Sequence, residues 1–341
     1  MKKKSLLTGD RPTGPLHIGH YAGSLKNRIA MQKDYETYIM LADSQAITDN
    51  FDNIEKVRRN VYEVVADYLA VGIDPGKASI FLQSAISALP EITQYLLNLV
   101  SINRIGHNPT VKAECKQKEY GESVPAGFYL YPIYQVADII AFDADVVPVG
   151  RDQAPMLELA REVVRKFNIQ YKSDVFVEPL PIFPKFENNV PGLDGQKMSK
   201  SLGNAIYLKD SRDEIVKKVK KMKSDPSRKS ISDPGNPEHA VAFSYLDIFD
   251  PDTEEVLKLK QQYRAGGLGD NVVKERTLEL IDAVIAPIRE RRALIFAEPT
   301  LIESVIKEGT MKAKDKAEQT LKRCKDAMGL SYDFLYTIKK F

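Results

Sequence analysis

The sequence predicts an α/β fold, a mainly parallel sheet flanked by helices, with a helical region after it. Two observations predict this class. Before residue 205, short β-branched or aliphatic runs alternate with longer segments of helical periodicity, which is the pattern of βαβ units. After residue 205 only helical segments remain. A chain of 341 residues can form two domains, and we expect them at 1–205 and 206–341.

The strands are expected where short runs of β-branched and aliphatic residues occur. These runs are Ser5–Thr8, Thr37–Ala42, Ser79–Leu82 and Asp145–Val149. The helices between them are expected where apolar residues recur every three or four positions. They cover Tyr21–Lys33, Ile54–Val71, Leu89–Ile102 and Ala154–Phe167. In a sheet of this kind, ligands bind where the carboxyl ends of strands meet the amino termini of helices.

The change from alternating strands and helices to helices alone follows a Pro/Gly-rich stretch, Glu178 to Gly195, which continues into GQKMSKSLGN. Beyond it the chain shows helical periodicity separated only by loops. The expected helices are Ser211–Lys223, Thr253–Arg264, Lys274–Ala297, Leu301–Glu308 and Met311–Met328.

Composition and charge narrow the function classes. No apolar run approaches 18 residues, so we expect no transmembrane helix, and the basic start MKKKSLLTGD lacks the apolar stretch of a signal peptide. Cys115 and Cys324 form no metal-ligand pattern, which is typical of reduced thiols in a cytoplasmic protein. The net charge of +2 does not by itself predict a polyanionic partner, so any nucleic-acid site must be a local patch.

The two histidines of LHIGH, His17 and His20, are the first candidate functional residues. They lie three residues apart after a Gly-, Pro- and Thr-rich turn that follows the first strand. No adjacent acid or cysteine completes a metal site. The backbone N–H groups of a helix start, close approach at Gly19 and two imidazole donors favour a phosphate ligand. On this motif alone, two histidines that merely satisfy a helix start are an equal alternative.

A second motif, KMSKS at residues 197–201, places two lysines in a Gly-rich loop about 180 residues later. Paired ammonium groups on a mobile loop can hold a polyphosphate. Alone, the motif would indicate only an exposed basic loop. The combination of HIGH after the first strand with KMSKS is far more specific, and it resembles the signature pair of class I aminoacyl-tRNA synthetases.

The resemblance extends over essentially the whole chain. The segments GDRPTGPLHIGHY, DYLAVGIDP, YPIYQVADI, VPVGRDQ and PIRERR…AMGL are similar to those of bacterial tryptophanyl-tRNA synthetases. This resemblance implies a Rossmann-type catalytic domain, a helical anticodon-binding domain and a homodimer. It implies an enzyme that joins L-tryptophan and ATP, with Mg²⁺ bound to the ATP, into an adenylate and then charges tRNA-Trp. It implies neither a metal site on the protein nor a DNA or membrane partner.

The resemblance also implies roles for individual residues. The catalytic residues, at the triphosphate and the departing pyrophosphate, would be His17, His20, Lys197 and Lys200. The ATP site would comprise Asp10, Arg11, Thr13, Gly19, His20, Gly150, Asp152, Lys197, Met198, Ser199 and Lys200. The amino-acid site would comprise Leu7, Gly9, Tyr131, Gln135, Asp138, Val147 and Gln153. Lys112 or Lys118 could also reach the phosphates, although solvated loop lysines are an equal reading.

The segment VGRDQ follows the last expected strand, at the sheet edge where a nucleotide would bind. Gly150 would leave room for adenine or ribose, and Asp152 would accept from ribose hydroxyls. Gln153 would contact the amino acid or the α-phosphate. By itself the segment could also be only a helix cap.

Amino-acid specificity depends on a stripe of polar residues. Tyr131, Gln135 and Asp138 lie at i, i+4 and i+7 of one helical segment and share a face. The resemblance implies that Tyr131 holds the α-amino group and that Asp138 accepts the indole N–H, which is donor-only. The pattern YxxxQxxD, in which Gln135 is the glutamine, also resembles tyrosyl-tRNA synthetases. Leu7, where those enzymes place a tyrosine, cannot hydrogen-bond a phenol and favours tryptophan.

Three alternatives to a tryptophan enzyme stay open: a tyrosyl-tRNA synthetase, a small-molecule nucleotidyltransferase with the same phosphate site, and a non-catalytic RNA-binding paralogue. The full KMSKS motif and the long helical region argue against the second. The intact histidines and lysines of both motifs argue against the third.

In the helical region, the segment KKVKKMK at residues 217–223 cannot place all five of its lysines on one helix face. One side of the helix could still meet tRNA phosphates, and such binding would be sensitive to salt.

Overall fold

The computed structural model describes residues 3–121, 123–183, 190–200 and 202–332. Within these residues, five strands form one parallel sheet in the order β3-β2-β1-β4-β5. The strands are β1 (Ser5–Asp10), β2 (Glu36–Leu41), β3 (Ala78–Leu82), β4 (Val146–Pro148) and β5 (Leu180–Ile182). The predicted α/β class with a Rossmann-type parallel sheet is confirmed, as are the four expected strands. β5 is not among the expected strands, because its three residues are too few to show the residue pattern of a β-strand.

The sheet reverses its direction of growth at β1. β1 pairs with β2 over its whole length, from Ser5 opposite Glu36 to Asp10 opposite Leu41. On its other edge β1 pairs with β4. The chain therefore adds β2 and β3 to one side of β1, and β4 and β5 to the other. This reversal leaves a crevice between the carboxyl ends of β1 and β4, where ligands of open α/β sheets bind.

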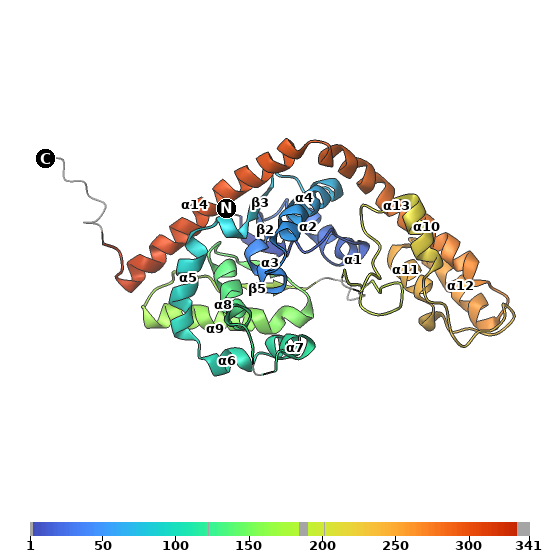
Figure 1. Ribbon diagram of the computed structural model, residues 1–341, viewed down its shortest axis with the longest axis horizontal. Coiled ribbons are helices and arrows are strands. Elements are labelled where there is room, and N and C mark those ends of the chain that lie inside the picture. The colour runs from blue at the N-terminus through green and yellow to red at the C-terminus, as the bar shows by residue number, and fades with distance from the viewer. Residues whose placement is uncertain (1–2, 122, 184–189, 201, 333–341) are drawn as a thin grey trace.

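Helices cover both faces of the sheet (Figure 1). The helices before β5 are α1 (Ile18–His20), α2 (Lys26–Met31), α3 (Asp43–Asn50), α4 (Ile54–Val71), α5 (Ala88–Leu96), α6 (Ile102–Gly106), α7 (Pro109–Gln117), α8 (Ala126–Ile140) and α9 (Ala154–Gln170). A π-helical turn, η1 (Tyr21–Leu25), joins α1 to α2, so the first expected helix begins earlier than predicted. α4 has its expected bounds. The expected helix over 89–102 is divided into α5, the 3-10 turn η3 (Leu97–Leu99) and α6.

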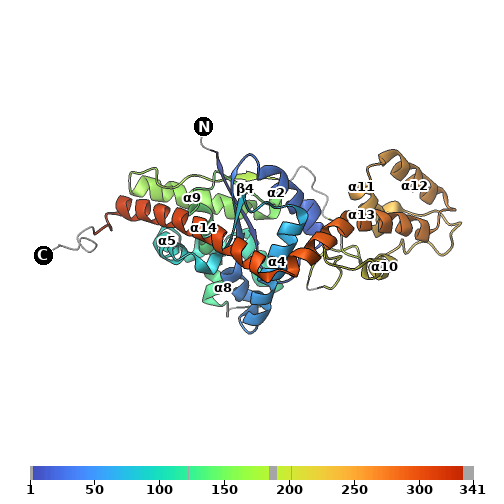
Figure 2. The same ribbon diagram turned by 90° about the horizontal axis from the view of Figure 1, so that it is seen from above.

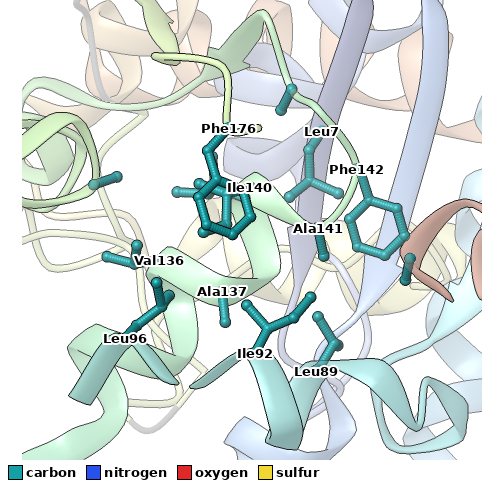
Figure 3. Close-up of a cluster of buried hydrophobic side chains, with 14 of the residues drawn as sticks. Leu7, Leu89, Ile92, Leu96, Val136, Ala137, Ile140, Ala141, Phe142 and Phe176 are labelled. Carbon is teal, nitrogen blue, oxygen red and sulfur yellow. The ribbon is translucent and has the colours of Figure 1, made fainter. Parts of the chain in front are cut away.

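Two apolar cores lie against the two faces of the sheet. Figure 3 shows part of the first, where Leu7 of β1 packs with side chains of α5 and α8. Successive residues of β2 alternate between the cores: Tyr38 and Met40 belong to the first, Ile39 and Leu41 to the second. Because both faces are covered, β2 is an almost continuous apolar run, as expected of a parallel strand.

After β5 the described chain forms only helices and loops. The helices are α10 (Arg212–Lys220), α11 (Val241–Phe249), α12 (Thr253–Ala265), α13 (Asp270–Phe296) and α14 (Pro299–Met328). α10 starts with a capping box, in which Ser211 Oγ accepts the N–H of Glu214 and the Glu214 carboxylate accepts the N–H of Ser211. A third apolar core joins α10 to α13. No helix among the described residues is both long and apolar enough to cross a membrane.

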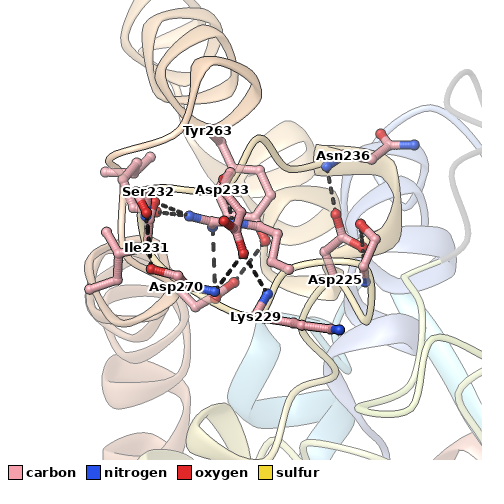
Figure 4. Close-up of polar contacts among 12 residues, drawn as sticks. Asp225, Lys229, Ile231, Ser232, Asp233, Asn236, Tyr263 and Asp270 are labelled. Atoms are coloured by element: carbon pink, nitrogen blue, oxygen red, sulfur yellow. Dashed lines mark hydrogen bonds and ion pairs between the residues drawn. The ribbon is translucent and has the colours of Figure 1, made fainter.

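The loop between α10 and α11 keeps its shape through carboxylates that accept backbone N–H groups (Figure 4). Asp225 accepts the N–H of Asn236 at 2.6 Å. Asp233 accepts the N–H of Lys229 at 3.0 Å. These bonds satisfy backbone donors that no helix or strand satisfies, so an irregular stretch of chain can still adopt one conformation.

The structure corrects the predicted C-terminal helices. The two expected helices, Leu301–Glu308 and Met311–Met328, are one continuous helix, α14. Gly309 does not break it, because the missing side chain lets α14 pack on β3: a Cβ at this glycine would lie 2.0 Å from the Ile80 carbonyl oxygen. α14 returns to the sheet and contacts β3 and α5 (Figures 1 and 2). The division into domains near residue 205 stays a prediction.

The packing at Gly309 predicts the sign of a helix substitution. Alanine is favoured over glycine inside a helix by about 1 kcal/mol, but here its Cβ would collide with the backbone of Ile80. We expect Gly309→Ala to lower the free energy of unfolding by about 1–3 kcal/mol, the usual cost of overpacking. Urea denaturation measures it, with Lys307→Ala, at an exposed position of α14, as the control. A Gly309→Ala protein more stable than the wild type would contradict this packing.

Candidate active site at the carboxyl edge of the sheet

Two cavities open at the carboxyl edge of the sheet. The large cavity, about 1120 Å³, lies between the LHIGH segment and the KMSKS loop. The small cavity, about 340 Å³, lies in the crevice between β1 and β4. Asp10 and Arg11, at the end of β1, line both cavities. A ligand in one cavity can therefore meet a ligand in the other at the end of β1.

The structure brings most of the predicted site residues to these cavities. Those that line the large cavity are Asp10, Arg11, Thr13, His17, His20, Lys197, Met198, Ser199 and Lys200. Those that line the small cavity include Leu7, Gly9, Gln135, Asp138, Val147, Gly150 and Gln153. Tyr131 lines a pocket of about 160 Å³, to which Gln135 and Gln153 also contribute. Gly19 and Asp152 are not among the described lining residues of these three spaces.

His17 and His20 cap the start of α1 reciprocally. Nδ1 of His17 accepts the backbone N–H of His20 at 3.3 Å, and Nδ1 of His20 accepts that of His17 at 3.2 Å. Because each Nδ1 accepts a hydrogen bond, each neutral ring carries its proton on Nε2, which can donate to a ligand. Gly19 allows this arrangement, since a Cβ there would lie 2.9 Å from the His17 ring.

Both histidines are neutral at neutral pH. Burial lowers the pKa of His17 to about 2, and the neighbouring His20 and Lys200 act in the same direction. Burial lowers the pKa of His20 to about 4, although Asp10 opposes the shift. The rings therefore supply hydrogen-bond donors without charge, and the positive charge of the large cavity comes from its lysines and arginines.

Backbone hydrogen bonds join the chain after KMSKS to the LHIGH segment. The N–H of Ile18 donates to the Ile206 carbonyl at 2.9 Å, and the N–H of Leu208 donates to the Leu16 carbonyl at 3.0 Å. These bonds place the two motifs on opposite walls of one cavity. The last residue of KMSKS, at position 201, lies outside the described residues.

Asn204 and Lys200 shape the KMSKS loop. Oδ1 of Asn204 accepts the N–H of Ser199 at 2.9 Å, and its Nδ2 donates to Asp194 at 2.9 Å. The Lys200 ammonium donates to the Gly14 carbonyl at 2.6 Å, and burial lowers the pKa of Lys200. The loop therefore lies against the turn that precedes LHIGH, with Lys200 at the contact.

Two residues outside the predicted set hold the Asp10 carboxylate. Arg28 of α2 donates to Oδ2 of Asp10 at 2.6 Å, and the Tyr68 hydroxyl of α4 donates to the same oxygen at 2.6 Å. Burial acts to raise the pKa of Asp10, but the charge of Arg28 and the hydrogen bonds from Arg28 and Tyr68 outweigh it, and the pKa lies below its ordinary value. A charged carboxylate is thus fixed where the two cavities meet. Arg28 could have been identified from the sequence as a basic residue on the buried side of an expected helix.

A second buried carboxylate anchors the chain just before LHIGH. Asp67 of α4 accepts the N–H of Leu16 at 2.7 Å and the Nε–H of Arg292, on α13, at 2.7 Å. Burial raises the pKa of Asp67 to about 6 against the attraction of Arg292. The helical region therefore contacts the LHIGH segment through this carboxylate. Asp67 and Arg292 belong to DYLAVGIDP and PIRERR, two segments that carry the resemblance, but nothing in the sequence indicates that they meet.

The small cavity combines apolar walls with a buried carboxylate. Leu7 of β1 and Val147 of β4 are buried apolar walls. Asp138 of α8 is buried, and burial raises the pKa of its carboxyl to about 7. Gln83, another residue outside the predicted set, donates to both Asp138 oxygens. It directly follows β3, so the rule that ligands bind at strand ends could have identified it.

The predicted stripe on α8 faces these spaces. Tyr131, Gln135 and Asp138 all line the small cavity or the adjoining pocket, and burial raises the pKa of the Tyr131 hydroxyl. After β4, the 3-10 turn η4 (Arg151–Gln153) follows Gly150, where a Cβ would lie 2.5 Å from Asp152 Oδ1. The Asp152 carboxylate lies beside Gly150 and accepts a hydrogen bond from Gln153 Nε2 at 3.2 Å.

Of the two candidate lysines near the phosphate motifs, Lys118 lines the large cavity and Lys112 does not. Lys118 forms an ion pair with Asp49 of α3, and Arg11 pairs with the same carboxylate at 2.6 Å. These cations, with the lysines of KMSKS and the Nε2–H donors of LHIGH, suit a polyphosphate. Such a site accelerates a reaction by positioning and charge stabilisation, without a nucleophile of its own.

Comparisons with known proteins agree with this chemistry. A family model described as tRNA synthetases class I (W and Y) matches residues 1–286. A tryptophan–tRNA ligase of Clostridium longisporum is 51% identical over 336 residues, which cover 97% of this chain and 98% of that protein. The tryptophanyl-tRNA synthetase of Campylobacter jejuni, solved with ADP and tryptophan, has a TM-score of 0.84 at 28% identity and covers 96% of this chain and 100% of that one. The chain therefore belongs to the class I tRNA synthetases for tryptophan and tyrosine, and within them to the tryptophan–tRNA ligases.

Proposed function

We propose that this chain activates L-tryptophan with ATP to tryptophanyl-adenylate and pyrophosphate and then transfers tryptophan to tRNA-Trp. The observation that carries the proposal is the meeting of two cavities at the end of β1. One is lined by both phosphate motifs, and the other contains the buried carboxylate of Asp138. The similar Campylobacter jejuni enzyme was solved with ADP and tryptophan, ligands of the two kinds that these cavities suit.

In this reaction the carboxylate of tryptophan attacks the α-phosphorus of ATP, and pyrophosphate leaves. The large cavity would hold the triphosphate, with the Nε2–H groups of His17 and His20 as neutral donors. Lys197 and Lys200 would stabilise the charge that develops on the pyrophosphate. Mg²⁺ would enter with the ATP, because Mg²⁺ at such sites is bound largely through substrate phosphates.

The small cavity would select the amino acid. Leu7 offers no donor to the oxygen of a phenol, whereas the donor-only indole N–H needs no partner other than the Asp138 acceptor, so the walls favour an indole over a phenol. Tyr131 and Gln153, in the adjoining pocket, lie on the side toward Arg11 and so suit the α-amino and carboxylate groups. This orientation would direct the carboxylate of tryptophan toward the end of β1.

The remaining partners are tRNA-Trp and a second copy of the chain in a cytoplasmic homodimer. For tRNA, the helical region offers lysines of α10 and the turn after it. Lys217, Lys220, Lys221 and Lys223 are exposed, whereas Lys218 is held by Asp210 at 2.5 Å. A local patch of this kind would bind tRNA phosphates with an affinity that falls as salt is raised.

The proposal is tested by amino-acid-dependent exchange of pyrophosphate into ATP. We expect exchange with tryptophan and little with tyrosine, because Leu7 supplies no donor to the phenol oxygen, whereas the indole N–H needs only an acceptor. Charging of tRNA-Trp should follow with the same amino acid. Exchange with tyrosine in place of tryptophan would establish the tyrosine alternative. Adenylation of another metabolite without any tRNA charging would establish a small-molecule nucleotidyltransferase.

The role of Lys200 predicts a split between catalysis and binding. We expect Lys200→Ala to slow adenylate formation roughly 100-fold or more, since a charge that stabilises the leaving pyrophosphate acts mainly in the transition state. Tryptophan affinity should change little, because Lys200 lines only the large cavity. Single-turnover kinetics and tryptophan titration measure the two effects. The control is Lys258→Ala, at an exposed position of α12. A loss confined to tryptophan affinity would refute the role.

The role of Asp138 predicts a loss of discrimination. In Asp138→Asn the amide oxygen would face the Gln83 donor, which leaves an N–H group facing the ring N–H of tryptophan. We expect the KM for tryptophan to rise roughly tenfold, and its preference over phenylalanine to fall, since a hydrogen bond to a charged group is lost. Exchange kinetics with both amino acids provide the measurement, with Asp34→Asn at an exposed site as control. Unchanged discrimination would exclude Asp138 as the acceptor.

A further inference from the structure

Gln83 lies behind the small cavity and outside every motif of the family resemblance. It begins the 3-10 turn η2 (Gln83–Ala85) directly after β3, and its side chain is buried, with the residue 6% exposed. A buried glutamine must satisfy both ends of its amide, because each unpaired polar group costs free energy. Here both ends are paired, and the pairs lead from α3 to α8.

The hydrogen bonds of Gln83 allow one orientation of its amide. Oε1 accepts the backbone N–H of Gln45, on α3, at 3.0 Å. Nε2 donates to the two oxygens of Asp138 at 2.9 and 2.8 Å. A backbone N–H can only donate and a carboxylate can only accept. Turning the amide over would set donor against donor and acceptor against acceptor, so the donor end must face Asp138.

The hydrogen bond from Gln83 favours the charged form of Asp138. Burial raises its pKa to about 7, and the bond from Gln83 acts against that shift. The other charged groups that line the small cavity are Asp10, Arg11 and Arg28, and Asp43 lies beside the turn that contains Gln83. Arg28 pairs with Asp10, Arg11 pairs with Asp49, and Asp43 accepts from Ser84. No ion pair with Asp138 occurs among the described residues.

We infer that Gln83 is a positioning residue for amino-acid selection: its amide, fixed between Gln45 and Asp138, holds the Asp138 carboxylate in one orientation toward a ring N–H donor in the small cavity. This inference rests on the proposed function. Gln83 acts through Asp138, so its effect is confined to the amino-acid site. The triphosphate site, on the other side of Asp10, does not depend on it. A carboxylate held in this way retains acceptor sites for the ligand, because its two oxygens offer about four lone pairs.

The test is pyrophosphate exchange by the full-length protein at varied tryptophan and pH between about 6 and 9. In the wild type, the KM for tryptophan should fall as pH rises through about 7, when Asp138 loses its proton. In Gln83→Met, with no donor, we expect the KM for tryptophan to rise roughly tenfold and the midpoint to move to higher pH. The KM for ATP should stay within about twofold, since Gln83 does not reach the large cavity.

A second variant provides a signature that a structural defect would not produce. In Gln83→Glu, the new carboxyl group, while protonated, can still donate to Asp138, and its other oxygen can accept from Gln45. We expect near-wild-type KM for tryptophan at neutral pH and a rise at alkaline pH, where two carboxylates would face each other. This slope is opposite to that of the wild type. Ser84→Ala, at the exposed next residue of the same turn, is the matched control.

The outcomes separate the inference from the proposed function. A wild type that shows no exchange with tryptophan refutes the proposed function and the inference with it. A wild type active with tryptophan, together with Gln83→Met of unchanged tryptophan KM and unchanged pH midpoint, refutes the inference alone. Parallel rises in the KM values for tryptophan and ATP in both variants, without any change in pH dependence, would assign Gln83 to general structural support and also overturn it.

Discussion

The backbone pairing of Leu16 and Ile18 with Ile206 and Leu208 is the interaction on which the rest of the site depends. It joins the segment that follows β1 to the segment that follows β5, and so it brings LHIGH and KMSKS to one cavity. Backbone bonds are suited to this task because they fix position without restricting side chains. The histidines and lysines of the motifs still line the cavity, while the buried carboxylate of Asp67 accepts the N–H of Leu16 in the same segment. The large cavity is therefore a consequence of chain pairing rather than of a single loop.

Charge in this site is distributed so that each buried ion has a partner. Asp10 is held by Arg28, and Asp67 by Arg292. The histidines need no charged partner because they are neutral: burial lowers their pKa values well below neutrality. An uncompensated charge in such an environment would be costly. This arrangement leaves the site with strong donors for phosphate and little bound charge that must be displaced, which suits a reaction whose nucleophile and leaving group both belong to the substrates.

The small cavity has a different electrostatic design. Asp138 has no ion-pair partner among the described residues and depends on the neutral amide of Gln83. A neutral donor stabilises the carboxylate without cancelling its charge, so the carboxylate can still attract an N–H group of a ligand. The contrast between Asp10, which is paired with a cation, and Asp138, which is not, matches their places at the junction of the two cavities and in the small cavity.

Sequence alone determined the features that local patterns encode. We could recognise four strands, the LHIGH and KMSKS motifs, and the stripe of Tyr131, Gln135 and Asp138 on one helix. Each of these depends on residues within a few positions of one another. Only the tertiary structure decided which distant residues meet. Arg28 with Asp10, Arg292 with Asp67 and Gln83 with Asp138 are pairs between separate elements, formed because packing buries one group and a second must satisfy it. The continuity of α14 through Gly309 has the same origin. From the local sequence a glycine predicts the end of a helix, but here it allows close packing of α14 on β3.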